Sequence, residues 1–380
     1  MKSKWLLGVL STLMFLAGCE NDPVTVGSNT QALEISKVDI LLVVDDSASM
    51  EGVQAQLPEL LDSFVAGSDE PGQERPALND IHLAVVSTNM GLGSAGAGLG
   101  IGGCEGLGDD GLFVELTAAD LAQCNPETRA FISYKDGRGE VTTEVAASCV
   151  PDVGTMGCGF EQPLEAMLKA LWPASDETIT FSDGSGHGED ANAGFLREDS
   201  LLVVIVVSDE DDCSNADGSV FDPIAANESG VGLNTLCATT DALFDVDRYV
   251  SGLRALREAE DDPIIFATIA GVPADLAAQQ TELDLSDAEA VAAYYESVLD
   301  APEMQQVIDP RGNADPADDN LVPSCTGASP DGSTIPHSYP PRRLVQVAEA
   351  FGNAGVIGSI CAEDYASAMG AVIRATAEEL

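Results

Sequence analysis

The sequence predicts an α/β fold with a doubly wound, mostly parallel central sheet and helices on both faces. Apolar, β-branched runs of strand length alternate along the chain with amphipathic segments of helix length. The two strongest runs, 38–44 and 201–207, are apolar at nearly every position. Such runs indicate parallel strands that are buried on both faces of a sheet, because the connections between parallel strands cover those faces with helices.

The elements follow one another in a regular order. We expect strands at 38–44, 81–86, 201–207, 264–269 and 355–360. Apolar side chains recur at helical spacing in the segments expected to be helices, at about 53–65, 160–172, 243–258, 287–299, 342–351 and 363–378. We interpret the intervening polar or glycine-rich segments as loop insertions in one domain spanning 37–380, near 90–158, 173–198, 209–240 and 271–340.

The first 36 residues predict export. A basic start is followed by an apolar stretch at 5–15 and then by small residues, which is the pattern of a signal peptide and too short for a spanning helix. The Leu-Ala-Gly-Cys run that ends at Cys19 resembles a bacterial lipobox. This resemblance implies a signal peptide at 1–18 and lipidation of Cys19; an ordinary secretory signal is the alternative. Residues 19–36 lack periodicity, and we expect them to form a tether.

We therefore expect an exported protein that is lipid-anchored to the bacterial cell envelope, at the outer membrane or cell surface rather than the inner membrane. The chain has 64 acidic and 16 basic residues and a formal net charge of −48. Such a surface repels nucleic acid and anionic membranes. We expect no nucleic-acid partner, and contact with a membrane only through the lipid.

Cysteine usage agrees with export. Besides Cys19 the chain has an even number of cysteines, which in an exported protein indicates disulfides. The disulfide candidates are Cys104, Cys124, Cys149, Cys158, Cys213, Cys237, Cys325 and Cys361. Each successive pair brackets one apparent insertion, so we expect the pairing to be sequential. No CxxC motif occurs, and the sequence therefore supports neither a zinc knuckle nor a thioredoxin-like site.

An Asp-x-Ser-x-Ser motif follows the first strand. It places Asp45, Ser47 and Ser49 on one exposed loop. These hard oxygen ligands suit Mg²⁺, Ca²⁺ or Mn²⁺. The alternative is that Asp or Ser only caps the next helix.

A second acidic segment follows the strand at 201–207 and begins at Asp209. The carboxyl ends of parallel strands meet at one edge of a sheet, so Asp209 is expected to join the first loop there. The alternative is a solvated acidic turn at 209–212. With both segments present, the sequence favours a divalent-metal site.

This arrangement resembles the metal-ion-dependent adhesion site (MIDAS) of von Willebrand factor type A (VWA) domains, in which a later core strand delivers a further Asp. At closer range the chain is similar to VWA lipoproteins of myxobacteria and related bacteria. The segments that carry this similarity lie at 39–45, 157–162, 192–197, 208–213 and 359–361. The resemblance implies a VWA fold over 37–380.

One ligand of the family is replaced. VWA sites usually add a Thr just before the helix that here begins near Phe160, and Cys158 stands in its place. Thr155 or Glu161 are the candidate substitutes. Glu161 would either coordinate the metal or simply favour the positive N-terminus of the helix.

The resemblance implies adhesion: an Asp or Glu carboxylate of a protein partner would supply the last ligand of the ion. Asp46, Asp211 and Asp212 are expected at the rim, where they would discourage nonspecific anions. We expect no enzyme, because the chain has only three histidines and neither an HExxH nor a GxSxG motif. The alternatives are a structural envelope lipoprotein with a vestigial metal site and a metal-dependent hydrolase.

Overall fold

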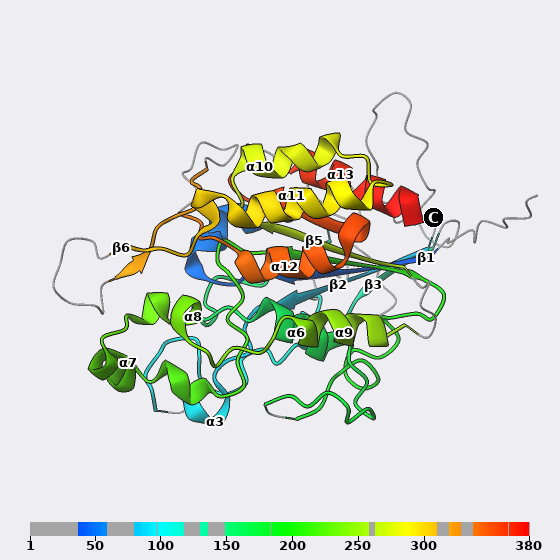
Figure 1. Cartoon of the computed structure of the whole chain (residues 1–380). Coiled ribbons are helices and arrows are strands. Elements are labelled where there is room, and N and C mark those ends of the chain that lie inside the picture. Colours follow the sequence, from blue (N-terminus) through cyan, green and yellow to red (C-terminus); the bar gives the residue numbers. More distant parts are fainter. Residues whose placement is uncertain are drawn as a thin grey trace, which may run out of the picture. The chain divides into compact units, whose positions relative to one another are not determined.

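A six-stranded sheet with the strand order β3-β2-β1-β4-β5-β8 organises the described part of the chain (Figure 1). Its strands are β1 (Lys37–Val44), β2 (Asp80–Ser87), β3 (Ile132–Lys135), β4 (Leu201–Val207), β5 (Ile264–Ala270) and β8 (Gly355–Ser359). Neighbouring strands are parallel, except that β3 pairs antiparallel with β2 at one edge. The expected α/β class with a mostly parallel central sheet is confirmed.

The computed structural model describes residues 37–58, 80–96, 98–117, 130–135, 149–182, 184–257, 263–309, 319–327, 337–363 and 365–379. These residues belong to one compact unit, Ile35–Leu380. The expected signal peptide, the tether, Cys19 and Cys124 lie outside the described ranges. None of the helices among the described residues is long and apolar enough to cross a membrane.

The α-helices match most of the expected helical segments. They are α1 (Glu51–Gln54), α3 (Gly93–Gly96), α6 (Pro163–Leu171), α7 (Pro223–Ser229), α8 (Leu236–Thr239), α9 (Asp247–Ala255), α10 (Ala274–Gln279), α11 (Ala288–Asp300), α12 (Arg342–Ala350) and α13 (Ala366–Glu379). Short 3₁₀ turns are η1 (Ala48–Met50), η2 (Gly218–Phe221), η3 (Leu233–Thr235), η4 (Gln280–Glu282), η5 (Pro302–Met304) and η7 (Gly352–Ala354). A separate two-stranded sheet pairs β6 (Ile308–Asp309) with β7 (Asn320–Leu321). Of the helix expected at 53–65, residues 59–65 lie outside the described ranges.

Helices cover both faces of the sheet, which lies between α13 and α6 in Figure 1. Side chains of β1 alternate between two apolar clusters: Ile40 and Leu42 belong to the cluster that contains α13, and Leu41 and Val43 to the cluster that contains α6. All seven residues of β4 are buried. The continuous apolar runs in the sequence thus arise because both faces of these strands are covered.

The chain changes its direction of winding between β1 and β4. From β1 it passes through α1, on the α13 side, to β2; from β4 it passes through α9, on the opposite side, to β5. The connections that follow β1 and β4 therefore run over opposite faces of the sheet, which makes the ends of these two strands its switch point. In sheets of this kind, ligands bind at such a switch point, outside the carboxyl ends of the strands.

Disulfides close several of the insertions. Cys213–Cys237 and Cys325–Cys361 confirm the sequential pairing for these four cysteines. For the first insertion the expected pairing is wrong: Cys104 is bonded to Cys158, not to Cys124, and Cys149 lies in another disulfide.

Close backbone packing explains this exchange of partners. A Cβ atom on Gly103 would lie 2.2 Å from the carbonyl oxygen of Gly157, so only glycine lets the two segments approach. This approach brings the Cα atoms of the adjacent Cys104 and Cys158 to 4.4 Å. The order of cysteines along the sequence carries no information about such a contact.

Candidate metal centre

Asp45 lies at the switch point, directly after β1. Its backbone N–H donates to the carbonyl oxygen of Val207 at the end of β4, at 3.0 Å. The carboxylate is fully buried and accepts hydrogen bonds from the Ser47 backbone N–H at 2.8 Å and from the Ser208 hydroxyl at 2.7 Å. The carboxylate of Asp45 is therefore oriented by residues that follow both β1 and β4.

The two serines of the motif face each other. Their hydroxyl oxygens, Oγ of Ser47 and Oγ of Ser49, lie 2.9 Å apart. Ser47 occupies the N-cap position of η1, but its side chain makes no capping hydrogen bond. The alternative in which this serine side chain only caps the next helix is therefore not what the structure shows.

Asp209 joins this group from the end of β4. Its side chain is hydrogen-bonded to Ser49, and its backbone N–H donates to the carboxylate of Asp45. The residue is 2% exposed, and its Oδ1 atom has no hydrogen-bond partner among the described residues. The structure thus places Asp45, Ser47, Ser49 and Asp209 in one hydrogen-bonded group at the carboxyl ends of β1 and β4.

Two glutamates lie close to Asp45 and Asp209, and the four side chains Asp45, Asp209, Glu161 and Glu210 form an acidic group. Glu161 is 1% exposed, shares a hydrogen bond with the side chain of Glu210, and has an Oε1 atom without a partner in the described part of the chain. The sequence analysis named Glu161 and missed Glu210 and Ser208. Their positions in the sequence could have indicated them, because Ser208 and Glu210 directly flank Asp209 after the strand at 201–207.

Burial and mutual repulsion disfavour the ionised form of the carboxyl groups in this acidic group. Burial, with repulsion from Asp45, raises the pKa of Asp209 to about 8 and that of Glu210 to about 7. Burial also raises the pKa of Asp45, against the hydrogen bonds it accepts, and that of Glu161 well above its usual range. Buried carboxylates normally require a paired cation. Their burial together here, with two oxygens lacking partners, fits a site that accepts a cation.

The donor set is composed of oxygen atoms only. In the part of the chain that the structure describes, no group of three or more His, Cys, Asp or Glu side chains is arranged so as to hold a metal ion. A cation at this position would meet the carboxylates of Asp45 and Asp209 and the hydroxyls of Ser47 and Ser49, with water completing its shell. Such ligands suit Mg²⁺ or Ca²⁺.

The structure also describes the surroundings of the site. Cys158, at the position of the family's threonine, forms a disulfide as expected, and Thr155, one of the two candidate substitutes, lies half-buried in the loop before α6. Asp46 and Asp212 are buried, so the expectation that they lie at the rim is wrong. The reason is that polar groups inside the fold engage them: the Thr88 hydroxyl donates to Asp46 at 3.4 Å, and Asp212 pairs with Arg343.

A cavity of about 180 Å³ opens beside the acidic group. Its wall contains Glu210 and Asp211 from the loop after β4, together with Phe160, Gln306 and Tyr339. Glu210, Asp211 and Asp212 of this loop thus line a concave part of the surface. No family model matches the chain, and no match was found among curated proteins.

Proposed function

We propose that the chain binds one divalent cation at the carboxyl ends of β1 and β4 and uses it to capture a protein partner through an Asp or Glu carboxylate. The observation that carries this proposal is the buried carboxylate of Asp209, which is hydrogen-bonded to Ser49, repelled by the nearby Asp45 carboxylate, and left with one oxygen unpartnered among the described residues. Mg²⁺ and Ca²⁺ are the preferred ions, with Mn²⁺ as a further option.

The chain's own residues would orient the ligands. Ser208 and the N–H of Ser47 fix the Asp45 carboxylate, and the contact between Ser47 and Ser49 aligns their hydroxyls. The bound cation would attract the partner's carboxylate. Such a contact is strengthened where water is excluded.

The wider context of the proposal is a VWA-type lipoprotein of the cell envelope. The Asp-x-Ser-x-Ser loop and Asp209 at neighbouring strand ends support the VWA part of it. The lipobox-like run ending at Cys19 supports the anchor, because lipid chains supply the membrane affinity that a strongly acidic domain lacks. Cys19→Ser should then release the protein from membranes; unchanged membrane fractionation of the variant would contradict the anchor.

Calorimetric titration with Mg²⁺ and with Ca²⁺ tests the metal site. Wild type should show one saturable component above any diffuse binding to surface acids, and Asp45→Asn should lose it. Asp39→Asn is the matched control, because Asp39 is a buried carboxylate on the same strand that is bonded instead to Arg197 and Ser200. If all three proteins titrate alike, the metal site is wrong and the structural-lipoprotein alternative takes its place.

Capture of a partner is the second test. A protein retained from envelope extract by the wild-type domain should be released by EDTA and should not bind Asp45→Asn. Retention that survives both changes would contradict metal-dependent binding.

A further inference from the structure

The loop that carries Asp209 has no regular secondary structure between β4 and the Cys213–Cys237 disulfide. Its position therefore depends on contacts with neighbouring elements. One such contact is the carbonyl oxygen of Asp209, which accepts from the Tyr339 N–H at 2.9 Å. Another is the Cys213 N–H, which donates to the carbonyl oxygen of Glu161 at 2.8 Å.

Asp211 and Asp212, further along the loop, bind the first turns of two different helices. Asp211 accepts hydrogen bonds from the backbone N–H groups of Arg343 and Leu344, at 3.0 and 3.4 Å, at the start of α12. Asp212 accepts from the backbone N–H of Leu164, at 3.0 Å, at the start of α6. These helix N–H groups have no partner within their own helices, so the aspartates satisfy them.

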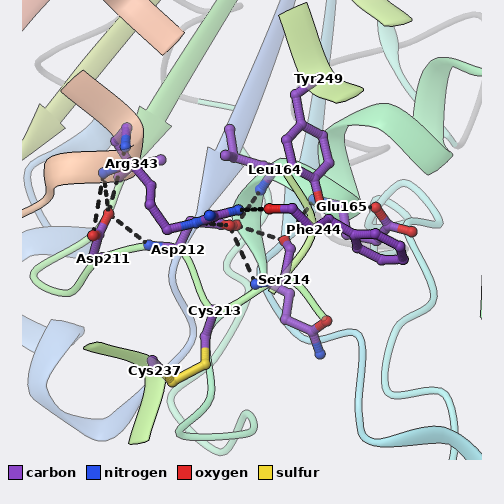
Figure 2. Close-up of polar contacts among 12 residues, drawn as sticks. Leu164, Glu165, Asp211, Asp212, Cys213, Ser214, Cys237, Phe244, Tyr249 and Arg343 are labelled. Carbon is purple, nitrogen blue, oxygen red and sulfur yellow. Dashed lines mark hydrogen bonds and ion pairs between the residues drawn. A yellow bond between two sulfur atoms is a disulfide. The ribbon is translucent and has the colours of Figure 1, made fainter. Parts of the chain in front are cut away.

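The side chain of Arg343 joins these two contacts (Figure 2). Its Nε atom donates to Asp212 at 3.0 Å, and its Nη2 atom donates to the carbonyl oxygen of Phe244 at 2.7 Å. Ser214 completes the cluster: its hydroxyl donates to Asp212 at 2.6 Å and accepts from the backbone N–H of Glu165 at 3.0 Å.

We propose that Arg343 is a positioning residue of the metal centre, which locks the loop after β4 onto α6 and α12 and so holds the Asp209 carboxylate beside Asp45. This role rests on the proposed metal binding. Asp212 is completely buried, so loss of the guanidinium would leave a buried negative charge without its cation. The loop would then rearrange to hydrate that charge, and Asp209 would move with it.

The chain contains a well-matched control. Arg197 forms the same kind of pair with Asp39, at 2.7 Å, on the first half of β1, away from the strand ends that carry the site. The side chain of Arg197 is 16% exposed and that of Arg343 17% exposed. Replacing either arginine by methionine therefore removes a similarly buried charge partner, but only Arg343 contacts the loop of Asp209.

The experiment compares wild type, Arg343→Met, Arg343→Lys and Arg197→Met by calorimetric titration with Ca²⁺ and by thermal unfolding. We expect both methionine variants to lower the melting temperature. Only Arg343→Met should also weaken ion binding, by about tenfold or more, as is typical for residues that orient metal ligands. Arg343→Lys keeps the charge and should recover part of the affinity.

A third variant, Asp212→Asn, keeps the hydrogen-bond acceptor for Leu164 but removes the charge that fixes Arg343. It should weaken ion binding in the same direction, and it tests the role of Arg343 if Arg343→Met does not fold. Unchanged affinity in Arg343→Met or in Asp212→Asn, or an equal loss in Arg197→Met, would overturn the positioning role alone. Absence of a saturable ion site in wild type would overturn the proposed function itself.

Discussion

Individual buried charges in this protein fall into two groups. Lys169 pairs with Asp110, Arg248 with Glu165 and Arg343 with Asp212, so burial of each carboxylate is balanced by a cation. At the metal centre, by contrast, Asp209 and Glu161 each keep one oxygen without a hydrogen-bond partner among the described residues. Since a buried unpaired carboxylate is costly, this contrast marks the centre as the place where an external cation has most to offer.

The buried pair of Lys169 and Asp110 should matter for stability. Lys169 lies on α6 and is 1% exposed, and Asp110 also accepts a hydrogen bond from His187 at 3.1 Å. Lys169→Met breaks a buried pair and should lower the free energy of unfolding by roughly 3 kcal/mol in urea titrations. The control is Lys135→Met, whose half-exposed pair with Asp80 should contribute about 1 kcal/mol or less. Equal losses in the two variants would contradict this ranking.

Asp110 should also make the free energy of unfolding depend on pH in the acid range. Burial would raise the pKa of Asp110, but hydrogen bonds from His187 and Lys169, and their charges, lower it overall. A carboxyl with a lowered pKa stabilises the fold above its unfolded pKa of about 3.9, and this contribution disappears as the pH falls through the folded value.

The difference in urea midpoint between wild type and Asp110→Asn should therefore be large at pH 6 and shrink toward pH 3. Asp190→Asn, an exposed acid in the same loop as His187, is the control. A difference that stays constant with pH would contradict the ionic contribution of Asp110.

At the scale of elements, helix ends are fixed by single side chains. The carboxylate of Asp287 accepts from the backbone N–H groups of Glu289 and Ala290, both at 3.1 Å, at the start of α11. Removal of such a cap typically costs about 1 kcal/mol. Asp287→Ala should lower the free energy of unfolding by about that amount in urea titrations.

Asp300, the last residue of α11, provides the matched control. An acid at the carboxyl end of a helix is unfavourable to the helix dipole, so Asp300→Ala should be neutral or slightly stabilising. A loss equal to that of Asp287→Ala would show that the cap is not responsible.

Much of the sheet could be predicted because its strands are buried on both faces, which leaves a continuous apolar run such as 201–207. The positions of Asp45 and Asp209 could be anticipated for a related reason: Asp45 directly follows one such run, and Asp209 lies two residues after the other. The role of Arg343 could not, since its partners Asp211 and Asp212 lie far away in sequence and no periodic pattern links them. The same applies to Cys104–Cys158, which depends on the close approach of two glycines.

For the whole molecule, the disulfide framework gives a countable prediction. The described cysteines are all disulfide-bonded, namely Cys104, Cys149, Cys158, Cys213, Cys237, Cys325 and Cys361. Thiol titration of the denatured, unreduced domain from residue 35 onward should therefore find no reactive thiol. Reduction before titration is the control and should expose eight. Two or more free thiols without reduction would contradict the framework.

The third apolar cluster of the protein depends on these bonds. It lies apart from the two clusters that cover the sheet and consists of Leu92, Cys104, Cys158, Phe160, Cys213, Phe221 and Leu236. Within it, the rings of Phe160 and Phe221 contact each other at a tilt, with their centroids 4.2 Å apart. So small a cluster holds little stability of its own without covalent links.

A reducing milieu should therefore melt this cluster while the sheet stays folded, as a separate unit of local unfolding. Glu161 and Asp212 directly adjoin its residues Phe160 and Cys213, so the acidic group would lose its support in that partly unfolded state. The sheet would then stay folded while the proposed cation site is disordered. If the acidic group binds a cation as proposed, that binding would require an oxidising compartment, whereas folding of the sheet would not.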